Sequence, residues 1–232
     1  MMIELNDVTK SYQTGQMTTQ VLKGISMGLS EGEIGVILGP SGSGKTTLMN
    51  IIGGLDRCDG GSVRVDGVEL TGLKDDDLTE FRRGHIGFVF QFYNLVPNLT
   101  VAENIEVVAN ISESPLNMDE VLRAVGLSDK KDRFPRELSG GEQQRVSIAR
   151  AIVKNPRLLL CDEITGALDY ATSRDILKLV QAINRQYGTT ILMITHNTAI
   201  AAMANEVLKL RGGVVTESTR NETVADAERI EW

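Results

Sequence analysis

The N-terminal part of the chain alternates apolar and polar residues with the period of a β-strand. Positions 2–12 place apolar residues such as Ile3 and Leu5 on one face, and positions 20–27 repeat this pattern. We therefore predict two strands of an antiparallel sheet, the first at the edge of that sheet, joined by a polar loop over 13–19.

Farther along the chain, the apolar residues form short continuous runs, which are typical of buried strands. These runs occupy 34–38, 86–90, 157–162 and 190–195. Apolar periodicity and capping residues predict helices at 47–52, 75–83, 101–109, 118–125, 140–152 and 171–186. Glycine-containing turns predict hairpins over 60–70 and 206–216. Strands that alternate with helices in this way predict an α/β fold.

The sequence predicts one domain over all 232 residues, built from unequal parts. No strand pattern interrupts the helices of about 92–156, so we expect a helical subdomain there, inserted into a core of about 1–91 and 157–215. The remaining tail, about 216–232, is polar and predicts a short helix from Thr223.

Composition narrows the set of partners. The net charge of -7 and the 4% share of aromatic residues argue against a nucleic-acid surface, so we expect no nucleic-acid partner. Cys58 and Cys161 are far apart in the sequence, which fits a reducing compartment and no structural metal. We see no signal-peptide pattern and no apolar run long enough to span a bilayer. Contact with a membrane would therefore run through another subunit.

Residues 39–46 satisfy the phosphate-binding pattern G-x-x-x-x-G-K-[ST], between a predicted strand and a predicted helix. Glycines let successive backbone N–H groups turn inward as a nest for phosphate oxygens, and the following helix adds its positive N-terminal end. Lys45 would reach the β- and γ-phosphates, and the Thr46 hydroxyl would ligate Mg²⁺. The alternative is a glycine-rich turn with a solvated lysine. The strand–loop–helix context favours a nucleoside triphosphate site.

Polar side chains follow three of the predicted buried strands: Gln91, then Asp162 with Glu163, and then His196. Ligands of open α/β sheets bind at the carboxyl ends of the strands. A buried acid is costly unless it is paired or bound to a cation, which favours a functional interpretation of the two carboxylates. A single histidine is more often structural, but here it joins the others at an equivalent strand end. We therefore treat these residues as candidate site residues.

Two further features have both a structural and a functional interpretation. Tyr12 ends the first predicted strand, either as an ordinary strand-end tyrosine or as a ring stacked on a purine base. Ser139 is a good helix N-cap, and Gly140 and Gly141 leave backbone N–H groups open at the start of the helix. Composition alone favours a plain capped helix there. From the residues alone, both alternatives stay open.

Taken in order along the chain, these motifs resemble those of the ATP-binding-cassette (ABC) ATPases from Met2 to about Val215. One string is highly specific to that family: Leu-Ser-Gly-Gly-Glu-Gln-Gln at 138–144, ahead of a strand that ends in Asp-Glu. The resemblance implies a P-loop NTPase fold with a RecA-like parallel-sheet core, an N-terminal antiparallel β subdomain and an inserted α-helical subdomain. It also implies a Mg²⁺-dependent ATPase with ATP and Mg²⁺ as cofactors.

The resemblance carries the family's roles to matching positions. Tyr12 resembles the aromatic residue that stacks on adenine, and Gln91 the glutamine that touches Mg²⁺ and the attacking water. Asp162 resembles the aspartate that holds Mg²⁺, Glu163 the catalytic glutamate, and His196 the histidine that contacts the γ-phosphate. The phosphate cradle would consist of Gly39, Pro40, Ser41, Gly42, Ser43, Gly44, Lys45, Thr46 and Thr47. Mg²⁺ and the cradle lysine would neutralise phosphate charge while the glutamate polarises water.

The resemblance assigns a separate task to the signature string. In the family, its residues contact the nucleotide bound by the opposite subunit of a head-to-tail dimer. The matching residues are Ser139, Gly140, Gly141 and Glu142. This chain carries one copy of each motif, so we expect an ATP-dependent homodimer with a second copy of this chain. One departure is that Ile164 replaces the usual proline after Glu163; no chemical group is lost, so we expect an active enzyme.

Local strings at 50–57, 85–91 and 165–169 resemble those of the macrolide-export and lipoprotein-release group, which includes peptide-resistance and cell-division ATPases. This implies a transmembrane permease partner, contacted beside Gln91 and the helices after Phe92. It also implies a cytoplasmic location at the inner face of the cell membrane, and export or force transmission as the task. Two alternatives stay open: an ATPase that regulates a membrane partner without transport, and a soluble non-transport ABC ATPase.

Overall fold

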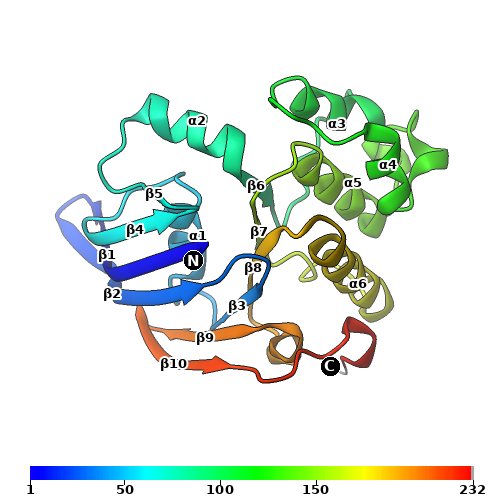
Figure 1. Ribbon diagram of the computed structural model, residues 1–232. Helices are drawn as coiled ribbons and strands as arrows, with labels where there is room; N and C mark the ends of the chain where they lie inside the picture. Colours follow the sequence, from blue (N-terminus) through cyan, green and yellow to red (C-terminus); the bar gives the residue numbers. More distant parts are fainter. Residues whose placement is uncertain (231–232) are drawn as a thin grey trace.

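The computed structural model describes residues 1–230 and contains two β-sheets with helices between and around them (Figure 1). The first sheet is antiparallel, with strand order β2-β1-β4-β5. Its strands are β1 (Ile3–Thr14), β2 (Met17–Leu29), β4 (Gly60–Val65) and β5 (Val68–Glu69). The predicted edge position of the first strand is wrong, because β4 pairs with β1 on the side opposite β2. The predicted loop over 13–19 is also too long, because the two strands continue until Thr14 pairs with Met17.

The second sheet has the strand order β10-β9-β3-β8-β7-β6, and all its neighbouring strands are parallel except β10 and β9. Its strands are β3 (Ile34–Leu38), β6 (Ile86–Val89), β7 (Leu158–Asp162), β8 (Thr190–Thr195), β9 (Glu206–Arg211) and β10 (Val214–Arg220). The second strand of the predicted hairpin over 206–216 extends four residues farther, because β10 continues to Arg220.

The continuous apolar runs of the sequence reflect strands that are buried on both faces. In β7, Leu158 and Leu160 belong to one buried cluster, whereas Leu159 and Cys161 belong to another. The first cluster fills the space between the two sheets around helix α1 (Lys45–Ile52). The second lies under the helices that cover the opposite face of the parallel sheet. The parallel sheet is therefore the central layer of the fold.

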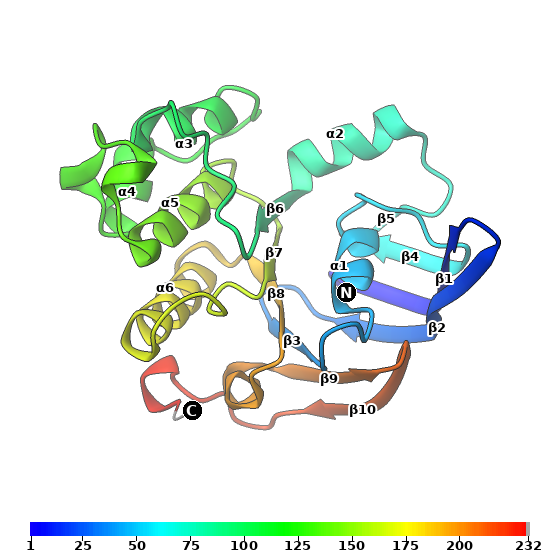
Figure 2. The same ribbon diagram turned by 180° about the vertical axis from the view of Figure 1, so that it is seen from behind.

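The remaining helices flank this central layer (Figures 1 and 2). They are α2 (Asp75–His85), α3 (Val101–Ala109), α4 (Met118–Ala124), α5 (Gly140–Ile152) and α6 (Tyr170–Tyr187). Short 3-10 helices lie at η1 (Ser128–Lys130), η2 (Pro135–Glu137), η3 (Thr198–Met203) and η4 (Ala227–Arg229). Within residues 1–230, none of the helices combines the length and the hydropathy that crossing a bilayer requires.

Helices α3, α4 and α5 pack on one another beyond β6, on the side where α6 also lies (Figure 2). Helix α5 also packs against β6 and α6, and so connects this group to the sheet. Because α5 belongs to both packing units, the division into a core and a helical subdomain remains a prediction.

The C-terminal segment packs against α6. The predicted helix from Thr223 begins later, since the structure has only the 3-10 turn Ala227–Arg229. Ala227 is fully buried, and its N–H donates to the side-chain oxygen of Gln181 (3.1 Å). The last two residues of the predicted tail, 231–232, lie outside the described residues.

Candidate functional site

The phosphate loop, residues 39–47, leads from β3 into α1, as the motif requires. Gly42 (φ 75°) and Gly44 (φ 102°) adopt left-handed backbone conformations that side chains disfavour. A Cβ on Gly39 would lie 2.3 Å from the carbonyl oxygen of Leu210, so the loop packs closely against β9 at this point. The glycines therefore serve both the curvature of the loop and its close packing.

The polar side chains of the loop are not satisfied as they are in an ordinary turn. Lys45 is buried, and its Nζ donates to the carbonyl oxygens of Gly39 (2.7 Å) and Pro40 (3.1 Å). Ser43 is also buried, and its hydroxyl makes no hydrogen bond to any described residue. A buried hydroxyl without a partner costs about 1–3 kcal/mol. The loop thus holds an ammonium group and an unpaired hydroxyl that phosphate oxygens would satisfy.

Three of the predicted site residues, which follow β6, β7 and β8, meet Lys45 of this loop. The Glu163 carboxylate lies 3.8 Å from Lys45 Nζ through Oε1 and 3.1 Å from His196 Nδ1 through Oε2. Gln91 is part of the same group, because a Cβ on Gly166 would lie 3.5 Å from both Gln91 Nε2 and Glu163 Oε2. An ammonium, an amide, a carboxylate and an imidazole therefore face one small volume.

The backbone of Glu163 is held in an uncommon conformation. Its φ is 44°, in the left-handed region that residues with a side chain rarely adopt and that often marks functional sites. Its N–H donates to the carbonyl oxygen of Ile194 (3.0 Å), and its own carbonyl accepts from the N–H of Gly166 (2.9 Å). Ile164, which replaces the family proline, is buried in the cluster under the helices. These contacts hold the backbone of Glu163 in this conformation without a proline.

Asp162 supplies a second carboxylate next to Glu163. Burial raises the pKa of Asp162, and the negative charge of Glu163 acts in the same direction. Lys45 and a hydrogen bond with Thr46 oppose this shift but do not cancel it. A partly buried carboxylate with a raised pKa next to a second carboxylate favours a bound cation, because a cation offsets both the burial and the repulsion.

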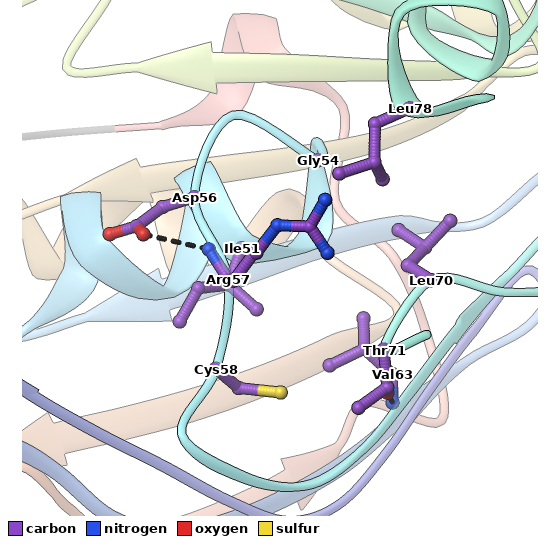
Figure 3. Close-up of a pocket in the computed structure, with 9 residues that line it drawn as sticks. All are labelled: Ile51, Gly54, Asp56, Arg57, Cys58, Val63, Leu70, Thr71 and Leu78. Atoms are coloured by element: carbon purple, nitrogen blue, oxygen red, sulfur yellow. Dashed lines mark hydrogen bonds between the residues drawn. The ribbon is translucent and has the colours of Figure 1, made fainter. Parts of the chain in front are cut away.

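Tyr12 lies next to the phosphate loop with its hydroxyl fixed. The hydroxyl donates to Asp56 Oδ2 (2.5 Å), and Thr47 is a further hydrogen-bond partner. Lys10 Nζ lies 5.0 Å from the centre of the ring and donates to Asp56 Oδ1 (2.7 Å). Asp56 is in turn fixed by the N–H of Arg57 (2.7 Å, Figure 3). The sequence did not predict this aspartate, although Lys10 and Tyr12 share a strand face, which could have suggested a common partner.

Two hollows near the site differ in what they can hold. The space behind Asp56, shown in Figure 3, has a volume of about 10 Å³, so it can hold no more than a water molecule. A groove of about 430 Å³ lies directly beside the phosphate loop and is lined by Pro40, His196 and Leu210, among others. The site is therefore open to solvent on the side where His196 lines this groove.

The signature segment, residues 138–144, forms the N-terminus of α5. The Ser139 hydroxyl accepts from the N–H of Glu142 (3.3 Å), and the Ser139 N–H donates to the Glu142 carboxylate (2.8 Å). Lys130 forms an ion pair with the same carboxylate. The hydrogen bond from Lys130, followed by that from Ser139, lowers the pKa of Glu142. This segment is a complete capping box.

The glycines of the signature segment are required by close packing. A Cβ on Gly141 would lie 2.4 Å from Thr172 Cγ2 on α6, and one on Gly140 would lie 2.9 Å from the Tyr93 hydroxyl. Among the described residues, no hydrogen bond or ion pair links 139–142 to the phosphate loop. Within residues 1–230, these predicted site residues therefore contribute no hydrogen bond or ion pair to the phosphate loop of their own chain.

Arg150 on α5 is a further residue that the sequence did not indicate. Its guanidinium donates to the carbonyl oxygens of Tyr93 (2.9 Å) and Asn94 (2.5 Å), in the loop that follows Gln91. Burial lowers the pKa of Arg150. The arginine fixes this loop to the signature helix. No local pattern could reveal this contact, because its partners are more than fifty positions earlier in the chain.

Comparison with curated proteins finds relatives across nearly the whole chain. The chain is 48% identical over 233 residues to the putative ABC transporter ATP-binding protein MG065 homolog of Mycoplasma pneumoniae, covering 99% of this chain and 50% of that protein. It is 43% identical to the uncharacterized ABC transporter ATP-binding protein YknY of Bacillus subtilis, covering 97% and 100%. It is 40% identical to the macrolide export ATP-binding/permease protein MacB of Escherichia coli, covering 94% and 34%. The chain therefore spans about half of the Mycoplasma protein and about a third of MacB.

Solved structures share the fold. One is described as a dimeric structure of a post-hydrolysis state of the ATP-binding cassette MJ0796 bound to ADP and Pi; it has a TM-score of 0.86 and 38% identity over 94% of this chain and 98% of that one. Another, cbiO1 from Clostridium perfringens, has a TM-score of 0.84 and 27% identity over 94% and 88%. The fold and the phosphate loop define an ATP-binding cassette. The chain belongs to the ABC transporter family, whose model matches residues 22–166. The predicted resemblance and fold class are confirmed.

Proposed function

We propose that this chain is the Mg²⁺-dependent, ATP-hydrolysing subunit of an ABC transporter, which closes head-to-tail on a second copy of itself and drives a separate membrane permease. The observation that carries this proposal is the meeting of Lys45, Gln91, Glu163 and His196, which follow four neighbouring parallel strands, β3, β6, β7 and β8. Phosphoryl transfer to water needs a positive phosphate cradle and a group that orients the attacking water.

ATP would bind along the phosphate loop, with its adenine against the ring of Tyr12. The Tyr12 hydroxyl is tied to Asp56, which leaves the ring to act as a fixed stacking surface. The phosphate oxygens would accept from the Ser43 hydroxyl, which has no partner among the described residues, and from Lys45, which would exchange its loop carbonyls for them. The open N-terminus of α1 would add backbone N–H donors.

Mg²⁺ would be held by the Thr46 hydroxyl, Asp162 and Gln91, and it would neutralise phosphate charge. This donor set suits Mg²⁺, which takes few protein ligands and keeps phosphate and water oxygens in the rest of its shell. The residues 1–230 contain no group of three or more His, Cys, Asp or Glu that could hold a metal alone. Burial and the neighbouring Glu163 carboxylate raise the pKa of Asp162, and a bound cation would offset both, which supports the assignment.

Glu163 would polarise the attacking water. Its carboxylate lies within 4 Å of both Lys45 and His196, and two backbone hydrogen bonds fix its position. His196 would contact the γ-phosphate from the open side of the site. Loss of such a general base typically lowers the rate by a factor on the order of 10²–10⁴.

In the dimer, the second copy of the chain would supply hydrogen-bond donors to the nucleotide that is bound in the phosphate loop of the first copy. The residues it would bring are Ser139, Gly140, Gly141 and Glu142. The capping box leaves other backbone N–H groups of the first turn of α5 available to an anion. The dimeric form of the related cassette MJ0796 supports this arrangement.

The permease would bind in a groove of about 550 Å³, which we name the docking groove. It is lined by residues that include Leu55, Arg82, Phe88, Ile111 and Lys154. Phe88 lies in β6, the strand that leads to Gln91. A movement of the permease against Phe88 would therefore be transmitted to Gln91 along this strand. Contact with the permease would place the chain in the cytoplasm, at the inner face of the membrane. The macrolide-export relatives favour export or force transmission as the task.

Glu163→Gln tests the proposal directly. The variant should bind ATP but not hydrolyse it, because the amide keeps the shape of the side chain and loses the base. ATP should then hold two copies together, and light scattering after size exclusion should report a dimer with ATP and a monomer without it.

Glu113→Gln, in an exposed loop of the helical region, is the matched control and should hydrolyse ATP like the unchanged chain. If Glu163→Gln turned over ATP normally, or stayed monomeric at saturating ATP, the proposed mechanism would be wrong.

A further inference from the structure

The docking groove combines apolar walls with an unusual pair of cations. Leu55, just after α1, and Ile111, just after α3, both line it and are 48% and 59% exposed. They come from distant parts of the chain, so the groove bridges the sheet and the helical group. Large exposed apolar side chains along one groove favour a partner that is itself apolar.

Arg82 and Lys154 lie side by side in this groove. Lys154 Nζ donates to the carbonyl oxygen of Arg82 (2.6 Å), while the Arg82 guanidinium donates to the Gly54 carbonyl (2.6 Å) and the Thr79 hydroxyl (2.8 Å). Neither cation forms an ion pair with any described residue. Burial, together with the positive charge of Arg82, lowers the pKa of Lys154 to about 8. Partly buried cations are normally paired, so this arrangement carries an unmet demand for negative charge.

We propose that the docking groove binds an apolar segment of the membrane partner that carries a carboxylate, and that this carboxylate pairs with Lys154 and Arg82. The inference rests on the proposed function, which supplies the membrane partner, and it adds the chemistry of the docking segment. A free phosphate or a lipid headgroup would satisfy the cations but would leave Leu55 and Ile111 in water. An apolar segment without a carboxylate would bury the two cations unpaired.

The test uses the whole chain and two synthetic amphipathic peptides of Leu, Ala and Ser that differ only in a central Glu or Gln. The Glu peptide should bind at least about tenfold more tightly by fluorescence anisotropy, as expected for a desolvated charge pair. Carbodiimide, which joins a carboxylate to a neighbouring amine with loss of water, should couple the Glu peptide to Lys154. Mass spectrometry of the digest should locate that amide bond.

Lys154→Met should reduce binding of the Glu peptide to the level of the Gln peptide. Lys178→Met is the matched control, because Lys178 on α6 already pairs with Glu228, and it should bind both peptides like the unchanged chain. Equal binding of the two peptides, no binding of either, or coupling of the Glu peptide only at other lysines would overturn the proposal. So would displacement of the Glu peptide by inorganic phosphate or by vesicles of anionic phospholipid alone. ATP hydrolysis in the same preparation tests the proposed function separately.

Discussion

The phosphate loop and residues 139–142 of the signature segment are both glycine-containing stretches that lead into a helix, yet the chain satisfies the polar side chains of only 139–142. Farther along the signature segment, the buried Gln144 side chain has no hydrogen-bond partner among the described residues. In the signature segment, Ser139 and Glu142 satisfy each other in a capping box, and Lys130 neutralises the glutamate. In the phosphate loop, the Ser43 hydroxyl is buried without a partner, and Lys45 folds back onto the carbonyls of its own loop.

This difference separates a rigid element from one that is stabilised by its ligand. A helix that caps itself holds its shape alone and can be presented to another molecule without reorganisation. A loop with an unpaired buried hydroxyl and an ammonium group gains stability when an anion satisfies both. We therefore expect nucleotide to change the phosphate loop much more than it changes the signature segment.

Among substitutions in the phosphate loop and the signature segment, Lys45→Ala should have the largest effect. Lys45 is the buried lysine that contacts both Glu163 and the carbonyl oxygens of the phosphate loop. Without its ammonium group, ATPase activity should fall by a factor on the order of 10² or more. Calorimetry should also show weaker ATP binding. Lys131→Ala, an exposed lysine near the signature segment, is the control. Unchanged ATP affinity in Lys45→Ala would remove the phosphate loop from the nucleotide site.

The signature segment should instead be sensitive to volume. Gly141→Ala places a Cβ 2.4 Å from Thr172 Cγ2, and that side chain cannot easily turn because its hydroxyl donates to Asp169 (2.6 Å). Overpacking of this kind costs about 1–3 kcal/mol of unfolding free energy. The double variant with Thr172→Ser, which removes only the offending methyl group, should recover most of the loss in urea unfolding. Without that recovery, the cost would have another origin, such as the backbone of α5.

Two serines give the sharpest contrast. Ser139→Ala removes a helix cap and should lower the unfolding free energy by about 1 kcal/mol. Ser43→Ala removes an unpaired buried hydroxyl, so it should leave the isolated chain equally stable or more stable while weakening ATP binding. Urea unfolding with and without ATP measures both effects. If Ser43→Ala destabilised the isolated chain as much as Ser139→Ala, the two regions would not differ in the way described.

The sequence predicted the strands well where burial is a local property. The continuous apolar run 157–162 predicts a buried strand because its successive side chains pack into clusters on opposite faces of the sheet. The predicted edge position of the first strand was wrong. The alternation of apolar and polar residues shows that one face of a strand is covered, but it does not show how many strands pair with it. The pairing of Ile3 with Val65 depends on a hairpin that returns from far along the chain.

The same limit applies to the site. Gln91, Glu163 and His196 could be predicted as neighbours because each follows a strand of one parallel sheet, and parallel strands end at the same edge. Asp56 and Arg150 were not predicted, because each acts through a tertiary contact to a loop or strand more than forty positions away. Motifs locate the groups that touch a ligand, whereas the residues that hold them emerge only from the packing.

The smallest effects concern the pH dependence of stability. The pKa of Glu142, in the signature segment, is lowered, whereas the surroundings of Asp162, beside the phosphate loop, raise its pKa. The hydrogen bonds from Lys130 and Ser139 lower the pKa of Glu142, so its stabilisation is complete above the ordinary value of about 4.3 and is lost as pH falls through the folded-state pKa. Burial and Glu163 raise the pKa of Asp162, so its destabilisation is complete above that raised pKa and disappears below the ordinary value of about 3.9.

Glu142→Gln should therefore lower the unfolding free energy near neutral pH by about 0.5 kcal/mol, and Asp162→Asn should raise it by a similar amount. Both differences should shrink in acid, where the carboxyl groups of the unchanged chain are protonated in both states. Urea unfolding across this pH range, with Glu113→Gln as the exposed control, measures the two slopes. A destabilising Asp162→Asn at neutral pH would mean that its carboxylate is already compensated within the chain, and the electrostatic argument for a cation beside Glu163 would fail.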